Sequence, residues 1–192
     1  MLPKELTTDR DFFVSVDVET AGPIPGDYSL LQIGACVVDS DKLPFTCFLK
    51  PISTNFMPGA LKVTGLDLEH LSEVGIEPAI AMKEFATWIE SSQFEGTRPV
   101  FVGLNAPFDW SFINYYFNRF LGANPFGHSA LDLKSMYMGM RGCRWAETGS
   151  HEMAKYLGVR HSGDHDALHD AQFQAVLFQE VYKRMRSSKL MR

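Results

Sequence analysis

Phe12-Phe13-Val14-Ser15-Val16-Asp17-Val18-Glu19 is the stretch of sequence on which the fold depends. Its β-branched and aromatic residues and its alternation predict a β-strand near the N-terminus. Side chains two residues apart on a strand point from the same face, so Asp17 and Glu19 should lie together at the end of a buried strand. Two carboxylates that close repel each other unless a cation lies between them or one is protonated. Hard divalent cations such as Mg²⁺ take oxygen ligands of this kind.

An isolated pair of acids can also be a solvated strand end, but two further acidic clusters argue against that interpretation. In Gly103-Leu104-Asn105-Ala106-Pro107-Phe108-Asp109, which follows a short apolar strand, Pro107 suits the first turn of a helix. Asp109 then falls in that turn, near the end of the strand. The segment His165-Asp166-Ala167-Leu168-His169-Asp170 opens the last long helical pattern. The chain thus has three acidic sites, one at a strand end and two in early helix turns.

These three segments resemble the motifs of the DEDDh 3′–5′ exonucleases. This DnaQ-like family includes RNase T and the proofreading subunit of DNA polymerase III. The motifs occur in the family's order, and the similarity runs from about Phe12 to Tyr182. The resemblance implies an RNase H-like fold, two Mg²⁺ or Mn²⁺ ions, and release of nucleoside monophosphates from the 3′ end of DNA or RNA.

The resemblance also implies roles for five catalytic side chains. The carboxylates would hold the two ions, and the histidine would act as general base by accepting a proton from the attacking water. The ions would activate this water and stabilise the charge on the leaving 3′ oxygen. The carboxylates are Asp17, Glu19, Asp109 and Asp170, and the general base is His165.

The position of His165 needs a particular local structure. In one regular helix, five residues would place His165 and Asp170 roughly 140° apart around the axis. We therefore expect a loop ahead of the helix, with Gly163 as its flexible point, so that His165 folds back over the site.

Four further residues are candidates for contact with the terminal nucleotide. Thr20 and Ala21 resemble the family's backbone grip on that nucleotide, and Asn105 and Phe108 could line its pocket. For Asn105 a helix cap, and for Phe108 core packing, are equally good interpretations.

The remaining pattern predicts an α/β fold, with a mixed five-stranded sheet and helices on both faces. The short turn between the second and third strands favours an antiparallel hairpin. The strands are expected at 12–18, 30–38, 45–50, 99–102 and 129–133, and the helices at 78–90, 107–121, 150–157 and 166–185.

Length and composition are consistent with one domain over residues 1–192, with a core at about 12–182. Without an apolar stretch of membrane-spanning length or a signal-peptide pattern, we expect a cytoplasmic protein with no membrane association. Cys36, Cys47 and Cys143 are odd in number and far apart, which favours reduced thiols over disulfides or a zinc site.

The net charge of −5 is unevenly distributed. Residues 183–192 form a basic tail with five Lys or Arg residues and no acid, which leaves −10 for the rest of the chain. Such a tail could contact a phosphate backbone, although a solvated helix end is the more ordinary interpretation.

The expected partner is the 3′ end of a single-stranded nucleic acid, and a homodimer or a polymerase partner is also compatible with the family. Two other functions remain open. One is a nucleic-acid-binding or polymerase-associated proofreading subunit with weak catalysis, which the intact set of five catalytic residues argues against. The other is a metal-dependent phosphatase acting on small nucleotides. Hydrolysis of an oligonucleotide compared with that of a free nucleotide separates these functions.

Overall fold

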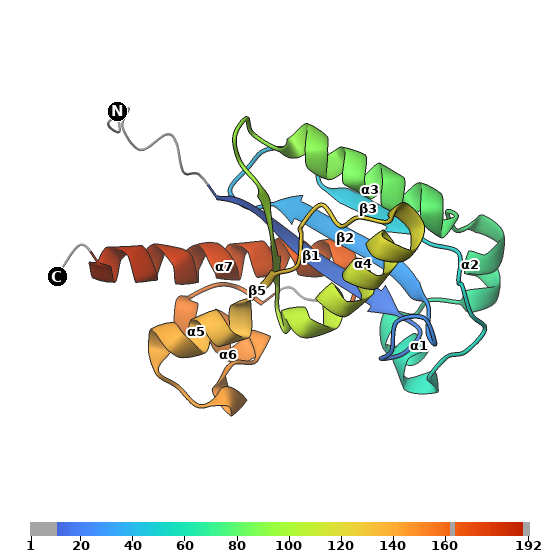
Figure 1. Cartoon of the computed structure of the whole chain (residues 1–192). Helices are drawn as coiled ribbons and strands as arrows, with labels where there is room; N and C mark the ends of the chain where they lie inside the picture. Colours follow the sequence, from blue (N-terminus) through green and yellow to red (C-terminus); the bar gives the residue numbers. More distant parts are fainter. Residues whose placement is uncertain (1–10, 162–163, 190–192) are drawn as a thin grey trace.

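The computed structural model describes residues 11–161 and 164–189, which form a mixed sheet in the order β3-β2-β1-β4-β5 (Figure 1). β2 pairs antiparallel with both β1 and β3, whereas β4 runs parallel to β1 and to β5. The predicted five-stranded sheet is confirmed, and each strand agrees with its expected bounds to within two residues at either end. The strands are β1 (Phe12–Thr20), β2 (Leu30–Val37), β3 (Phe45–Phe48), β4 (Pro99–Gly103) and β5 (Ala130–Asp132).

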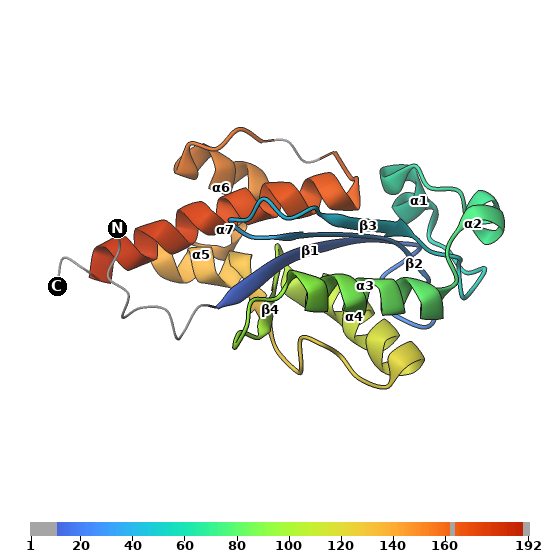
Figure 2. The same ribbon diagram turned by 90° about the horizontal axis from the view of Figure 1, so that it is seen from above.

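Helices cover both faces of the sheet, as predicted (Figure 2). One face carries α3 (Pro78–Ser92) and α4 (Ala106–Leu121), and the other carries α5 (Leu133–Arg141), α6 (Ser150–Leu157) and α7 (Ala167–Lys189). α1 (Pro58–Thr64) and α2 (Leu68–Val74) lie near the end of the sheet where β1 terminates. The sequence did not predict α1, α2 or α5. Among the helices of residues 11–161 and 164–189, none combines the length and apolar character needed to cross a membrane.

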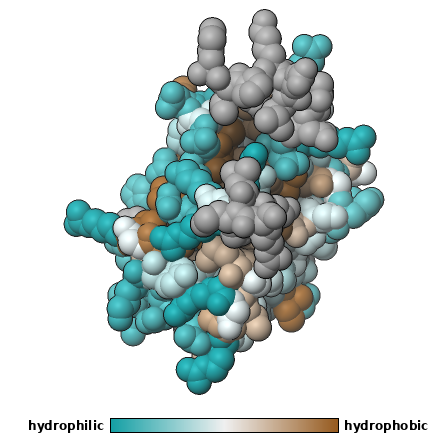
Figure 3. Space-filling view, turned by 90° about the vertical axis from the view of Figure 1, so that its left-hand side faces the viewer, coloured by the Kyte–Doolittle hydropathy of each residue, from teal (hydrophilic) through white to brown (hydrophobic). Residues whose placement is uncertain are grey.

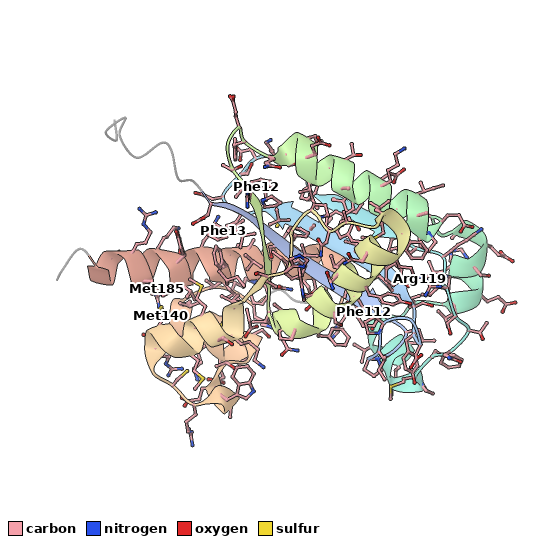
Figure 4. All side chains as sticks on the ribbon, in the orientation of Figure 1. Phe12, Phe13, Phe112, Arg119, Met140 and Met185 are labelled. Carbon is pink, nitrogen blue, oxygen red and sulfur yellow. The ribbon has the colours of Figure 1, made fainter. Side chains whose placement is uncertain are left out.

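β1 contributes to both layers, because successive side chains of a strand point to opposite faces of the sheet. Phe12, Val14, Val16 and Val18 belong to the larger core, which the sheet forms with α3 and α4. Phe13, on the other face, packs with its ring centroid 4.8 Å from that of Phe178 in α7. Figure 4 shows Phe12 and Phe13 together at the start of β1. Because Asp17 and Glu19 share the face of Phe13, they lie under α7 rather than in the larger core.

The first turns of α7 lie close against β1 and β2. Gly34 makes this possible, since a Cβ atom on it would be 2.1 Å from the backbone carbonyl of Ala167. Ser15 Oγ donates a hydrogen bond to the carbonyl of Ala171 at 2.7 Å. These contacts bring Asp170, in the same turn, to the sheet.

The segment expected as a basic tail continues α7 as far as the structure describes it. Lys183 forms an ion pair with Glu180 at 3.1 Å, and Arg184 donates to the carbonyl of Leu157 at 3.0 Å. Figure 3 looks at the side on which α7 ends, where hydrophilic side chains predominate. The division into a core and a tail, and the contact of the tail with nucleic acid, stay predictions.

We expect Gly34→Ala to lower the free energy of unfolding by about 1–3 kcal/mol, because the added methyl group forces the backbone of α7 away from β2. Urea denaturation measures this change. Gly59→Ala in α1 is the matched control, since no atom of the described residues outside this helix and the glycine's neighbours lies within 4 Å of the added Cβ, and it should not lower the stability. An unchanged stability for Gly34→Ala would show that α7 does not depend on this close approach.

Candidate active site

The end of β1 has a free edge on the side of β4. The parallel pairing with β4 covers Phe12–Ser15 of β1 and stops there. Past that point, the edge of β1 faces the first turn of α4. The register with β2 also shifts between Glu19 and Thr20. Such irregularities are frequent next to active sites because they redirect side chains.

Asp109 binds to this free edge. Its Oδ1 accepts a hydrogen bond from the backbone N–H of Val18, at 3.1 Å, between the two acids of β1. A tight turn aims it there: Asn105 has a φ of 71°, and α4 begins at the next residue. Asp132 Oδ1 accepts the N–H of Ala106 at 3.1 Å, which fixes the start of the helix. Asn105 occupies the N-cap position, but its side chain makes no capping hydrogen bond within the described structure.

His165 lies outside the regular helix, as its spacing from Asp170 required. α7 begins at Ala167, and His165 has a φ of 62°, which is unusual for a residue other than glycine. Its backbone N–H donates to Asp170 Oδ2 at 3.2 Å. Ligand-type atoms of Glu19, His165 and Asp170 all lie within 4.8 Å of one another. The loop is confirmed, whereas Gly163, its expected flexible point, lies outside the described residues.

Hydrogen bonds join the residues around His165 to one another. Asp166 Oδ1 accepts the N–H groups of Leu168 and His169, at 3.0 and 3.1 Å, and so caps α7. Nδ1 of His169 lies 3.0 Å from Asp164 Oδ2, and this hydrogen bond and charge raise the pKa of His169. His169 therefore contacts the segment ahead of the helix.

The carboxylates share one electrostatic environment. Burial, with help from Asp170, Asp109 and Asp166, raises the pKa of Glu19 to about 8. Burial raises the pKa of Asp109 to about 7 and also raises that of Asp170. The pKa of Asp17 lies well above its usual value because of burial and then the charges of Asp109, Glu19 and Asp170. The acids of the three motifs are therefore brought together, and a cation among them would relieve their repulsion.

Gln174 is a site residue that sequence analysis missed. It is 2% exposed and lies four residues after Asp170, on the same side of α7. Its Nε2 donates to Asp17 Oδ1, and its Oε1 accepts the backbone N–H of Leu104 at 2.7 Å. The spacing from Asp170 was the only signal that could have pointed to it.

The four candidate nucleotide contacts differ in accessibility. Ala21 is fully buried and its N–H donates to the carbonyl of Ser29, at 2.9 Å, so a nucleotide cannot reach it without movement of the chain. Thr20 is also buried. Phe108 is partly buried against the core, as in its packing interpretation, and Asn105 is exposed. Contact of all four with the terminal nucleotide stays a prediction.

Comparisons with known proteins identify the family of this chain. The RNase_T family model, described as Exonuclease, matches residues 14–178. The 3′-5′ DNA exonuclease Cap18 of Escherichia coli is 55% identical over 185 residues, which cover 96% of this chain and 99% of that protein.

Two solved structures superpose on most of the chain and confirm the predicted RNase H-like fold. The nuclease domain of 3′hExo, a DEDDh family member bound to rAMP, gives a TM-score of 0.74 at 15% identity over 90% of this chain and 92% of its own. E. coli Exonuclease I in complex with a dT13 oligonucleotide gives 0.73 at 22% identity, over 93% of this chain and 42% of its own. The extent of the family match and the identity to the E. coli enzyme show that the chain belongs to the DEDDh family of 3′–5′ exonucleases.

Proposed function

We propose that this chain releases nucleoside monophosphates one at a time from the 3′ end of single-stranded DNA. The observation that carries the proposal is the convergence of three distant segments: Asp109 is bonded to β1 between Asp17 and Glu19, while His165 and Asp170 come within 4.8 Å of Glu19. DNA is favoured over RNA because the 55% identical relative is a DNA exonuclease.

Exonucleases of this family depend on divalent metal ions, and the residues of the site fit such ions. The donors are carboxylate oxygens, the ligands that Mg²⁺ and Mn²⁺ prefer, and they are crowded enough to raise one another's pKa. Asp17, Glu19, Asp109 and Asp170 would hold two Mg²⁺ or Mn²⁺ ions. When bound, the ions would activate water and stabilise the charge on the leaving oxygen.

His165 would accept the proton of the attacking water on its imidazole ring. The side chain is exposed, so solvent reaches it, and it lies within 4.8 Å of Glu19 and Asp170. A histidine can accept a proton near neutral pH, whereas an ordinary carboxylate is too weak a base. The hydrogen bond from the His165 N–H to Asp170 holds the base beside the acids.

The proposal also includes residues that would contact the nucleotide. Asn105 and Phe108 adjoin Asp109 in the first turn of α4 and would contact the terminal nucleotide.

The cysteines Cys36, Cys47 and Cys143 are all free, which fits a reducing cytoplasm. A second copy of the chain or a polymerase as partner stays a prediction.

Purified protein should shorten a 5′-labelled single-stranded DNA stepwise with Mn²⁺ or Mg²⁺ and stop when chelator is added. Gel analysis of the products, with RNA and free nucleotides as parallel substrates, measures this activity. Asp109→Asn, which keeps the shape of the side chain, should lose most turnover. Release of internal fragments alone, or activity in excess chelator, would overturn the proposal. Preference for RNA or for free nucleotides would correct the substrate.

Without metal, the free energy of unfolding should fall by several kcal/mol between about pH 5 and pH 8. Glu19 keeps its proton up to about pH 8 in the folded protein but only to about 4.5 when unfolded. The stabilisation from this proton is therefore complete below about pH 4.5 and lost above about pH 8, and Asp109 acts in the same direction. Urea titrations in chelator measure the slope, which Glu19→Gln should reduce. Stability that rises over this range would contradict the raised pKa values.

His165→Ala should lower turnover by about 10²–10⁴-fold, as the loss of a general base typically does. Its affinity for Mn²⁺ should change little. His169→Ala is the matched control, and its effect should be much milder, because its ion pair with Asp164 is exposed and such pairs contribute little. Single-turnover kinetics at saturating Mn²⁺ compare the two variants. Equal losses of turnover in the two variants would contradict the assignment of His165 as the general base.

A further inference from the structure

Gln174 is a buried polar side chain to which the mechanism above gives no role. Buried amides are retained when their donors and acceptors are satisfied, and both ends of this amide are used. One end is bonded to Asp17 at the end of β1, and the other to the backbone of Leu104 in the turn that leads to Asp109. The side chain therefore links three elements of the site: β1, the β4–α4 turn and α7.

The chemistry of the two partners determines which way the amide points. The N–H of Leu104 can only donate, so the atom that faces it, at 2.7 Å, must be the amide oxygen. The amide nitrogen then faces Asp17 and donates to Oδ1. One oxygen of the Asp17 carboxylate is thereby occupied by a neutral donor, and the orientation of the whole group is restrained.

We propose that Gln174 is a positioning residue for the metal site, which holds Asp17 by one oxygen so that the other is presented to a divalent cation. Through Leu104 it also fastens the turn that places Asp109. This inference rests on the proposed function, because it takes the carboxylates to be metal ligands. Partners that orient metal ligands in this way typically contribute 10- to 100-fold to metal affinity or activity.

The chemistry of glutamine suits this task better than that of other polar residues. A lysine or arginine would donate to Asp17 but would also compete with the cation by neutralising the carboxylate. A glutamate would add another negative charge to a site that already holds four acids. Asparagine is one methylene shorter and could not reach Asp17 and Leu104 together. A neutral amide orients Asp17 without cancelling its charge.

The test is Gln174→Met, which keeps the length of the side chain and removes both hydrogen bonds. Isothermal titration calorimetry with Mn²⁺, in the absence of nucleic acid, should give a dissociation constant about 10- to 100-fold weaker than that of the wild type. At saturating Mn²⁺, kcat should return towards the wild-type value, because the base and the ligands are all present.

Gln32→Met is the matched control. Gln32 is also 2% exposed, donates to Asp166 Oδ2 at 3.0 Å and accepts the N–H of Ala167 at 3.4 Å. Its loss removes the same kind of buried bridge, but to an acid outside the four proposed ligands. Its Mn²⁺ affinity should fall clearly less than that of Gln174→Met, because neither of its hydrogen bonds is to one of the four proposed ligands.

Two results would overturn the inference while leaving the proposed function intact. One is an unchanged Mn²⁺ affinity in a cooperatively folded Gln174→Met. The other is an equal loss in Gln32→Met, which would indicate general loosening of α7. If Gln174→Met does not melt cooperatively, Gln174→Asn takes its place, with the same weakening expected. A wild-type protein that binds no Mn²⁺ would instead remove the proposed function, and this inference with it.

Discussion

Mutual repulsion among the acids at the end of β1 is the constraint on which the rest of the site depends. Burial and neighbouring charge raise the pKa of Asp17 and Glu19, so assembling the site costs the fold stability in the absence of cations. The scaffold counters this cost with neutral donors. The backbone N–H groups of Val18 and His165 bond to Asp109 and Asp170, and the amide of Gln174 bonds to Asp17. Each donor orients a carboxylate and leaves its charge in place.

The sheet and its helices hold these groups in position from opposite sides. α4 begins on one face and sends Asp109 around the end of β4 to the edge of β1. α7 lies on the other face, where the absence of a side chain at Gly34 allows its first turns to approach the strands. The apolar layers that anchor the two helices are separate, so each motif is supported by its own core. The geometry of the site thus follows from the alternation of β1 and from two helix starts.

Most of the fold and the main site could be predicted because their signals are local. The period of two in β1 paired Asp17 with Glu19, and the angle between helical positions placed His165 in a loop. The missed helices are all short, and most helical stability in proteins comes from tertiary packing. α1 has seven residues, buries none of its side chains and lacks a side-chain cap, and α5 has nine residues with Gly139 among them. The bonds of Gln174 join residues far apart in sequence and could not be derived from spacing. The bond of the Ala21 N–H to Ser29 likewise depends on tertiary structure and could not be derived from spacing.

The alternation of β1 also limits how the gene for this chain can change in length. Deleting or inserting one residue before Asp17 would exchange the two faces of the strand. Asp17 and Glu19 would then point into the apolar layer under α3 and α4, where unpaired charges cost several kcal/mol each. A change of two residues would preserve the faces, although it would shift the strand along its neighbours. Within β1, length variation in related genes should therefore be confined to even steps or be absent.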